Sequence, residues 1–242
     1  FKTRASFYVS AVMTLRLLTM PSINNMTSKS DFDLEELLMN GQKVIIYLCL
    51  PARDKTYFPL AALTLRQISD QIDAVADKMG GRLDRRFNFI DDEIGNMPKI
   101  TNLPNQLAFL TGKGIRHNLF IQSYAQLDYV YGKEVAQIIK DNCDLTIYLR
   151  SPNQDTRKEI SNDLGDYTVS TYSLNNNQPV GSLKMSGNRG ESTNLTGRKL
   201  LFPEEVKQIK RPNSLVMSDT YPAITYAPDL SKWTFNQFLG LG

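Results

Sequence analysis

The sequence predicts an α/β protein built on a doubly wound, mostly parallel sheet with flanking helices. Two observations support this fold class: short apolar runs rich in β-branched residues recur along the chain, and helical patterns bounded by Gly and Pro separate them. Strands that alternate with helices in this way pair in parallel, because each return crosses over through a helix. Ligands of such sheets bind beyond the carboxyl ends of the strands, so a functional site is expected there.

The individual elements follow from apolar periodicity and boundary residues. Strands are predicted at 44–50, 87–91, 118–122, 145–150 and 214–218. Helices are predicted at 33–38, 59–79, 105–110, 124–130, 133–140 and 154–164, with another beginning at Pro203. The run at 44–50 (VIIYLCL) is continuously apolar, which is typical of a strand buried on both faces of a parallel sheet.

The chain is expected to contain two parts. Residues 1–30 predict an N-terminal amphipathic helix followed by a polar connector, and residues 31–242 predict the α/β unit. Residues 174–197 are dominated by Asn, Gly and Ser without hydrophobic periodicity, which predicts a long polar loop. The basic residues of this loop fit either contact with a nucleic-acid backbone or an ordinary solvated surface. They are Lys184, Arg189, Arg198 and Lys199.

The composition is that of a soluble globular protein: of 242 residues, 41% are hydrophobic and 22% are charged. The net charge of +3 is compatible with a nucleic-acid partner but does not argue for one. No apolar run reaches the roughly 18 to 20 residues that span a bilayer. Cys49 and Cys143 lie in apolar, strand-like contexts and are expected to be buried, reduced thiols of a cytoplasmic protein.

The predicted strand at 87–91 ends in a row of carboxylates, Asp91, Asp92 and Glu93. Many ATP-hydrolysing enzymes hold a hydrated magnesium ion with the first acid of such a pair and orient the attacking water with the second. Either Asp91–Asp92 or Asp92–Glu93 fits that role, and an acidic turn that stays solvated or caps a helix is the alternative. The sequence contains no Gly-x-x-x-x-Gly-Lys-Ser/Thr loop to cradle the phosphates.

Gln122 ends the next predicted strand, at what would be the same edge of the sheet. A polar side chain there can touch a terminal phosphate and relay its loss to the following helix. The alternative is a Gln that only begins a loop or caps a helix. The sole histidine, His117, has no Cys, His or acidic residues at ligand spacing, so a zinc site is not expected.

Taken in order, several segments resemble the TraG-like coupling proteins of type IV secretion and conjugation. The most specific is the run Gln-Ser-x-x-Gln-Leu-x-x-x-Tyr-Gly, which begins at Gln122. The other segments are 30–38 (SDFDLEELL), 43–51 (KVIIYLCLP), 91–100 (DDEIGNMPKI), 112–134, 155–170 and 198–206 (RKLLFPEEV). The resemblance therefore extends over nearly the whole chain.

This resemblance implies the C-terminal part of a RecA-like nucleotide-binding domain, in a homo-hexameric motor that uses ATP and Mg²⁺. Asp92 would hold the Mg²⁺ through water, Glu93 would act on the attacking water, and Gln122 would sense the terminal phosphate. The partners would be DNA or a relaxase–DNA substrate and components of the secretion channel. In such proteins the phosphate-binding loop and the membrane segments lie earlier in the chain than the part that this sequence resembles. This fragment is therefore expected to be soluble, cytoplasmic and nearly inactive alone, while the full protein lies at the cytoplasmic face of the cell membrane.

One position departs from the family pattern. Relatives carry an Arg before the Gly-Ile of the third strand that would reach a neighbour's nucleotide, whereas this chain has Thr111, with Lys113 or Arg116 as candidates to replace it. The alternative functions are a different hexameric DNA translocase, a secretion ATPase, or a non-catalytic adaptor that retains the fold. An upstream phosphate-binding loop would separate an enzyme from an adaptor.

Overall fold

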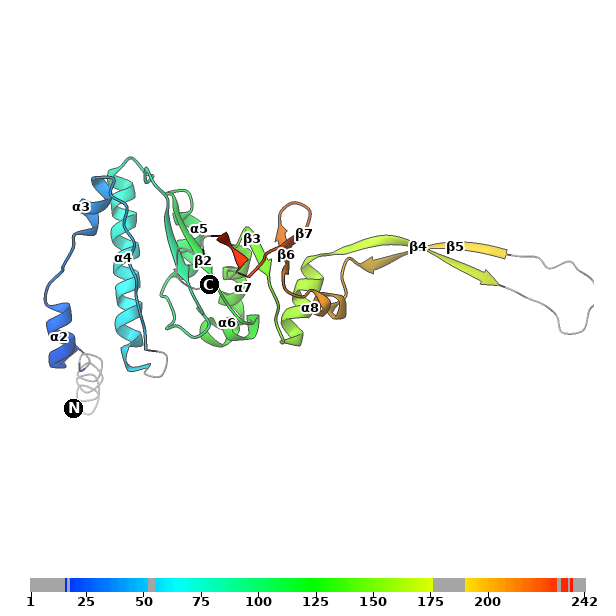
Figure 1. Ribbon diagram of the computed structural model, residues 1–242, viewed down its shortest axis with the longest axis horizontal. Coiled ribbons are helices and arrows are strands. Elements are labelled where there is room, and N and C mark those ends of the chain that lie inside the picture. The colour runs from blue at the N-terminus through cyan, green and yellow to red at the C-terminus, as the bar shows by residue number, and fades with distance from the viewer. Residues whose placement is uncertain are drawn as a thin grey trace, which may run out of the picture. The chain divides into compact units, whose positions relative to one another are not determined.

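The computed structural model describes residues 16, 18–51, 55–175, 190–229, 232–234 and 236. The chain divides into two compact units (Figure 1). The first comprises Phe1–Gln122 and Gln126–Cys143, and the second comprises Ser123–Ala125 and Asp144–Gly242.

The first unit contains a parallel strand pair flanked by helices. Its elements are α2 (Pro21–Thr27), α3 (Leu34–Met39), a 3₁₀ turn (Lys55–Tyr57), α4 (Phe58–Lys78), β1 (Phe87–Asp91), α5 (Leu103–Leu110), β2 (Ile115–Leu119), most of α6 (Tyr124–Tyr131) and α7 (Lys133–Asp141). β1 and β2 run in parallel, from Phe87 opposite Ile115 to Asp91 opposite Leu119. The carboxyl ends of the two strands therefore lie side by side.

Two apolar clusters hold this strand pair in place. Pro59 lies in the first turn of α4, where its missing N–H costs no intrahelical hydrogen bond. Residues of α4 then pack against β1 and β2 in a cluster that includes Ile72, Val75, Ala76, Phe89 and Ile115. The second cluster joins the turn after β1 to α5, α6 and α7, and it includes Ile94, Leu103, Leu107, Leu127 and Ile139. Together the clusters fix the loops that follow both strands.

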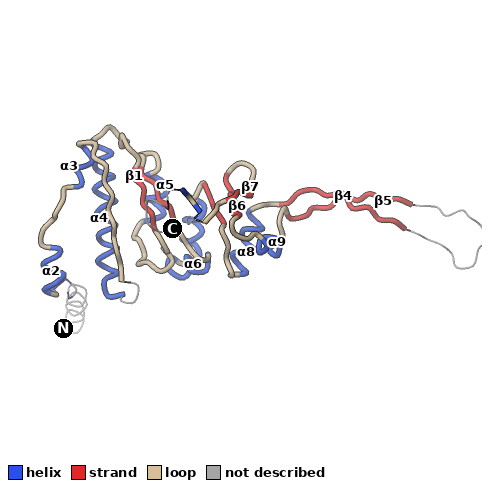
Figure 2. Tube along the Cα trace, in the orientation of Figure 1, coloured by secondary structure: helices blue, strands red, loops and turns tan. Residues whose placement is uncertain are grey.

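The second unit combines an antiparallel sheet, two helices and a long two-stranded ribbon (Figure 2). Its elements are β3 (Leu145–Tyr148), α8 (Gln154–Asp163), β4 (Asp166–Asn175), β5 (Gly190–Lys199), α9 (Pro203–Gln208), β6 (Asn213–Ser218) and β7 (Ala223–Tyr226). β6 pairs antiparallel with both β3 and β7, and β4 pairs antiparallel with β5. Asn153 caps α8 by accepting a hydrogen bond from the Thr156 backbone N–H at 2.8 Å.

Most predicted elements are found near their expected positions, including β1 and α5 to α8. The strand predicted at 118–122 lies earlier, at Ile115–Leu119, and α2 occupies part of the predicted N-terminal connector. The helix predicted before it falls largely on residues 1–15 and 17, which lie outside the described residues. Among the helices that the structure describes, none is both long and apolar enough to cross a membrane.

The apolar run at 44–50 was predicted as a buried strand, and this prediction is wrong for the structure described. No described strand pairs with it, and Ile45 and Tyr47 are 77% and 83% exposed. Cys49 is likewise exposed rather than buried, whereas Cys143 is partly buried. β-branched residues favour a strand mainly through packing against neighbouring strands, and the described residues supply no neighbour here.

The prediction of a polar loop over 174–197 is wrong at both ends of this range, where the structure has strands. β4 continues to Asn175 and β5 begins at Gly190, while residues 176–189 lie outside the described residues. Residues without hydrophobic periodicity still form this ribbon, because its ladder consists of backbone hydrogen bonds between the two strands.

Candidate functional site

The predicted site begins in the turn that follows β1. Asp91 ends the strand and is buried, whereas Asp92 and Glu93 are exposed. Glu93 has a φ of 52°, in the left-handed region that residues other than Gly seldom adopt. Such strained positions concentrate at functional sites, where the surrounding structure over-determines them. The turn therefore holds Glu93 in a conformation that its sequence alone would not favour.

Two amide side chains hold the Glu93 carboxylate. Asn96 Nδ2 donates to Oε2 at 2.9 Å, and Gln122 Nε2 donates to Oε1 at 2.9 Å. These hydrogen bonds, that of Asn96 first, hold the pKa of the Glu93 carboxyl below its usual value. The structure thus brings Glu93 and Gln122 into direct contact and keeps the carboxylate ionised.

Backbone hydrogen bonds join the segments that carry these two side chains. The Phe120 N–H donates to the Asp91 carbonyl at 3.1 Å, and the Ile94 N–H donates to the Phe120 carbonyl at 3.0 Å. The pairing of β1 with β2 is thereby continued past the last ladder residues. Gln122 does not end a strand as predicted, but it still emerges at the carboxyl edge of the pair, beside the acidic turn.

Gln126 on α6 is a residue of the site that the sequence did not single out. Its Oε1 accepts a hydrogen bond from the Gln122 backbone N–H at 3.3 Å. A Cβ added to Gly95 would lie 2.7 Å from the Cβ of Gln126, so the acidic turn packs directly against α6. The signal was present in the sequence, because Gln126 is the second Gln of the Gln-Ser-x-x-Gln-Leu run.

Asp91 has a different partner from its two acidic neighbours. Its Oδ2 lies 2.9 Å from His117 Nδ1, and the side chains of His117 and Asp91 are only 3% and 4% exposed. The imidazole also stacks on Phe89, with ring centroids 4.6 Å apart. His117 Nε2 is buried with no hydrogen-bond partner among the described residues. Because Asp91 points into this buried pair, the geometry favours Asp92–Glu93 as the exposed acidic pair.

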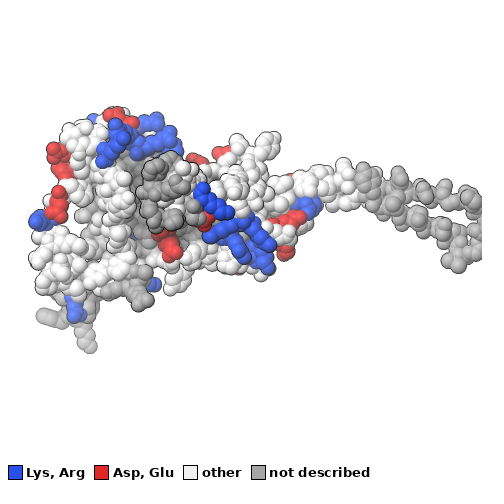
Figure 3. All heavy atoms as spheres, viewed as in Figure 1, with Lys and Arg blue, Asp and Glu red and all other residues white. Residues whose placement is uncertain are grey.

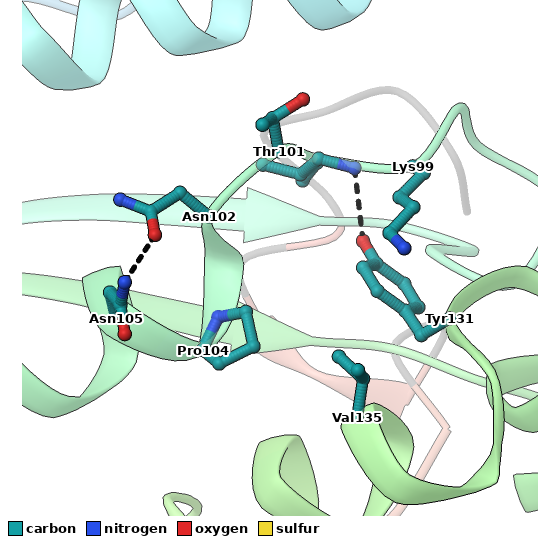
Figure 4. Close-up of a pocket in the computed structure, with 8 residues that line it drawn as sticks. Lys99, Thr101, Asn102, Pro104, Asn105, Tyr131 and Val135 are labelled. Atoms are coloured by element: carbon teal, nitrogen blue, oxygen red, sulfur yellow. Dashed lines mark hydrogen bonds between the residues drawn. The ribbon is translucent and has the colours of Figure 1, made fainter.

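The loop that follows the acidic turn is anchored by Tyr131, the Tyr of the same run. Its hydroxyl accepts a hydrogen bond from the Ile100 backbone N–H at 3.2 Å. Burial raises the pKa of Tyr131 to about 12, so the hydroxyl stays protonated. Figure 4 shows the ring between Lys99 and Val135. The three residues line a hollow of about 340 Å³. Tyr131 therefore fixes the start of α5 relative to the site.

Of the basic residues considered above, Lys184 and Arg189 lie outside the described residues, whereas Lys113 makes local contacts. Lys113 Nζ lies 2.6 Å from carboxylate oxygens of both Asp73 and Asp77 on α4, so it is tied down within its own unit. Thr111 Oγ1 donates to the Leu107 carbonyl at 3.1 Å, as an ordinary helix-end contact. These contacts occupy both side chains within their own unit. Arg116, which is exposed, is therefore the remaining candidate to replace the family arginine.

The donor set of the turn is suited to magnesium. Mg²⁺ prefers oxygen ligands, keeps several waters, and is commonly held through one or two carboxylates together with phosphates. Asp92 offers an exposed carboxylate beside Glu93. Within the described residues no cluster of three or more acidic, His or Cys side chains forms a closed metal cage. A water-mediated contact through Asp92 is the arrangement that these residues fit.

These features define an α/β protein with a polar site at the carboxyl ends of a parallel strand pair. The family model of the type IV secretory system conjugative DNA transfer proteins matches residues 1–227. The chain therefore belongs to this family, as its resemblance to TraG-like proteins predicted.

Individual relatives agree with this assignment. Over 212 residues the chain is 24% identical to Protein VirD4 of Agrobacterium fabrum, covering 87% of this chain and 30% of the relative. Over 206 residues it is 24% identical to the conjugal transfer protein TraG of Escherichia coli, covering 82% of this chain and 32% of the relative. The chain thus spans about a third of the length of these relatives.

Solved structures of a coupling protein share the fold. The unbound form of the bacterial conjugative coupling protein TrwBΔN70 matches with a TM-score of 0.63 at 19% identity, over 82% of this chain and 44% of that chain. TrwB in complex with ADP and Mg²⁺ matches with a TM-score of 0.58 at 19% identity, over 82% and 43%. The likeness confirms the predicted α/β fold class, a RecA-like fold that this chain represents in part.

Proposed function

We propose that this chain is part of an ATP-driven coupling protein that delivers DNA or relaxase–DNA substrates to a type IV secretion or conjugation channel. Family membership supports the process. The observation that carries the chemistry is the hydrogen bond between Gln122 and Glu93 at the carboxyl ends of β1 and β2. In ATP-hydrolysing enzymes this edge of the sheet faces the terminal phosphate.

Each of three side chains at this edge has its own role in the proposed reaction. Glu93, ionised because of its lowered pKa, accepts a hydrogen bond from the attacking water and aligns it. Gln122 donates to Glu93 in this structure, and we assign the same amide to contact a phosphate oxygen when nucleotide is bound. Asp92 would hold a Mg²⁺ ion through water, and that ion would neutralise charge on the phosphates.

The wider assembly follows from the same proposal. The full-length protein would act as a homo-hexamer at the cytoplasmic face of the cell membrane, attached through a segment outside this chain. Its partners would be channel components and the DNA-bearing substrate. The sequence of this chain contains no Gly-x-x-x-x-Gly-Lys-Ser/Thr loop, so we assign hydrolysis to the full-length protein and expect little from these 242 residues alone.

The test is ATP hydrolysis by the full-length protein with Glu93→Gln. Removal of the carboxylate is expected to lower kcat about 10²-fold or more while nucleotide binding is retained. Glu134→Gln is the matched control, because Glu134 is also exposed but belongs to α7 and not to the acidic turn. Turnover in Glu93→Gln equal to that of the control would remove Glu93 from the proposed role.

A further inference from the structure

The β4–β5 ribbon is a surface that the proposed ATPase site does not use. Its ten residue pairs run from Asp166 opposite Lys199 to Asn175 opposite Gly190. Within the described part of the chain each strand pairs only with the other, so both outer edges are open. Where the side chains are described, most are exposed, and Leu195 is 75% exposed. A two-stranded ribbon without a core is at best marginally stable in water.

The base of the ribbon, in contrast, is firmly attached to its unit. Arg198 donates to the Tyr167 hydroxyl at 3.0 Å and to Glu205 Oε1 at 2.7 Å, and its guanidinium lies 5.0 Å from the centroid of the Phe202 ring. Lys199 Nζ lies 3.6 Å from Asp166 Oδ1. The base therefore sets the direction of the ribbon, while the strands beyond it contact no other described element closely.

The charge of the strands favours a polypeptide partner over nucleic acid. Along 167–175 and 190–197 the sequence contains a single charged residue, Glu191. Figure 3 shows the described ribbon as uncharged surface beyond the charges at its base. Phosphate backbones are bound by Lys and Arg, which these strand segments lack. Uncharged, open edges are suited to pairing with another strand, because their backbone donors and acceptors are unsatisfied.

The register of the ribbon and one hydrogen bond at its base identify which backbone groups face outward. The Leu200 N–H donates to the Gly165 carbonyl at 3.0 Å, which marks these two as a hydrogen-bonded pair at the base. Antiparallel pairs alternate between hydrogen-bonded and non-hydrogen-bonded. The backbone groups of Thr168 and Ser170 therefore point away from β5, and those of Leu195 point away from β4.

We propose that the outer edge of β4 pairs antiparallel with the outer edge of β5 from a second copy of this chain, head to tail. Asp166 and Lys199, whose charged groups lie 3.6 Å apart within one ribbon, are at the same level on opposite strands, so Asp166 of one copy would also face Lys199 of the next across the new contact and charges of opposite sign would alternate there. Along the rest of the two strands, no residues of like charge would face each other across the new contact. A contact between two different surfaces repeats from copy to copy, and it gives a ring where the rotation between copies closes and an open filament where it does not.

Cross-linking of co-expressed full-length chains tests this pairing, in a background free of other cysteines (Cys49→Ser and Cys143→Ala within this segment). One chain carries Ser170→Cys and the other Leu195→Cys, and a short bismaleimide links them. The mixed product is expected to form roughly tenfold or more above a control, since adjacency raises the effective concentration. The control replaces Ser170→Cys by Tyr221→Cys, at a side chain that is 94% exposed.

A proline at an outward N–H provides the second measurement. Thr168→Pro in the Ser170→Cys chain removes an edge donor without removing a hydrogen bond of the ribbon itself, and it is expected to lower the mixed cross-link about tenfold. Thr168→Val keeps the donor and should leave the product unchanged. A mixed product no greater than the Tyr221 control, a dominant Ser170–Ser170 product, or no effect of Thr168→Pro would each overturn the proposal. None of these readouts depends on ATP hydrolysis.

Discussion

The acidic turn after β1 and the β4–β5 ribbon are both exposed, but they are built in opposite ways. In the turn, the Glu93 side chain is held by partners from two segments, Asn96 and Gln122. In the ribbon, side-chain contacts are concentrated at the base, around Arg198. The difference indicates that the turn acts through fixed side chains, whereas the ribbon offers backbone edges. Substitutions that disturb one region should therefore leave the other unaffected.

The largest effect on stability is expected beneath the acidic turn, at the buried Asp91–His117 pair. His117→Ala leaves a buried carboxylate unpaired and should lower the free energy of unfolding by about 3–5 kcal/mol. Replacing both residues by apolar side chains, Asp91→Leu with His117→Phe, should recover most of that loss, because a buried polar pair adds little over good packing. Urea unfolding of the unmodified chain and of these two variants measures this. Equal losses in the single and double variants would show that the pair is not the cause.

A smaller loss is expected where the turn packs on α6. Gly95→Ala places a methyl group 2.7 Å from Gln126 Cβ and should destabilise by about 1–3 kcal/mol through overpacking. Gly112→Ala is the matched control, because its nearest neighbour, the Phe109 carbonyl, would lie at an ordinary 3.8 Å. Thermal unfolding compares the two variants. A control as unstable as Gly95→Ala would contradict the close approach between turn and helix.

At the base of the ribbon the effect should be smaller still. Arg198→Ala removes an ion pair and two aromatic contacts that remain partly in water, so the loss of stability should be smaller than that of Gly95→Ala. Hydrogen exchange should nevertheless accelerate in β4 and β5 while β1 and β2 are unchanged. Faster exchange in β1 as well would contradict the independence of the two regions.

The smallest change concerns a titration. The pKa of Glu93 is lower in the folded chain than its usual value of 4.5, so the ionised carboxylate contributes to the stability of the fold at pH values above 4.5. This contribution is lost as the pH falls through the lower pKa of the folded chain. Gln122→Ala removes one donor, so the NMR titration midpoint of Glu93 should rise but stay below 4.5, because Asn96 still donates. An unchanged midpoint would indicate that the Gln122 contact is not formed in solution.

Local patterns in the sequence predicted what depends on local chemistry. Hydrophobic periodicity, capping residues and the length of the apolar runs predicted β1, most of the helices and the position of the acids at 91–93. What depends on distant partners was missed: the run at 44–50 lacks a described strand neighbour, and the ribbon consists of backbone pairing that composition does not reveal. The sequence also left open which acids pair, since the contact of Asp91 with His117 joins two strands.

The central claim is that Glu93 and Gln122 act together at one site. A double-mutant cycle on kcat for ATP hydrolysis by the full-length protein tests it most directly, with Glu93→Gln, Gln122→Ala and the combination. If the two residues work as a unit, the double variant should be no slower than the slower single variant. Losses that multiply, as for independent residues, would contradict the account.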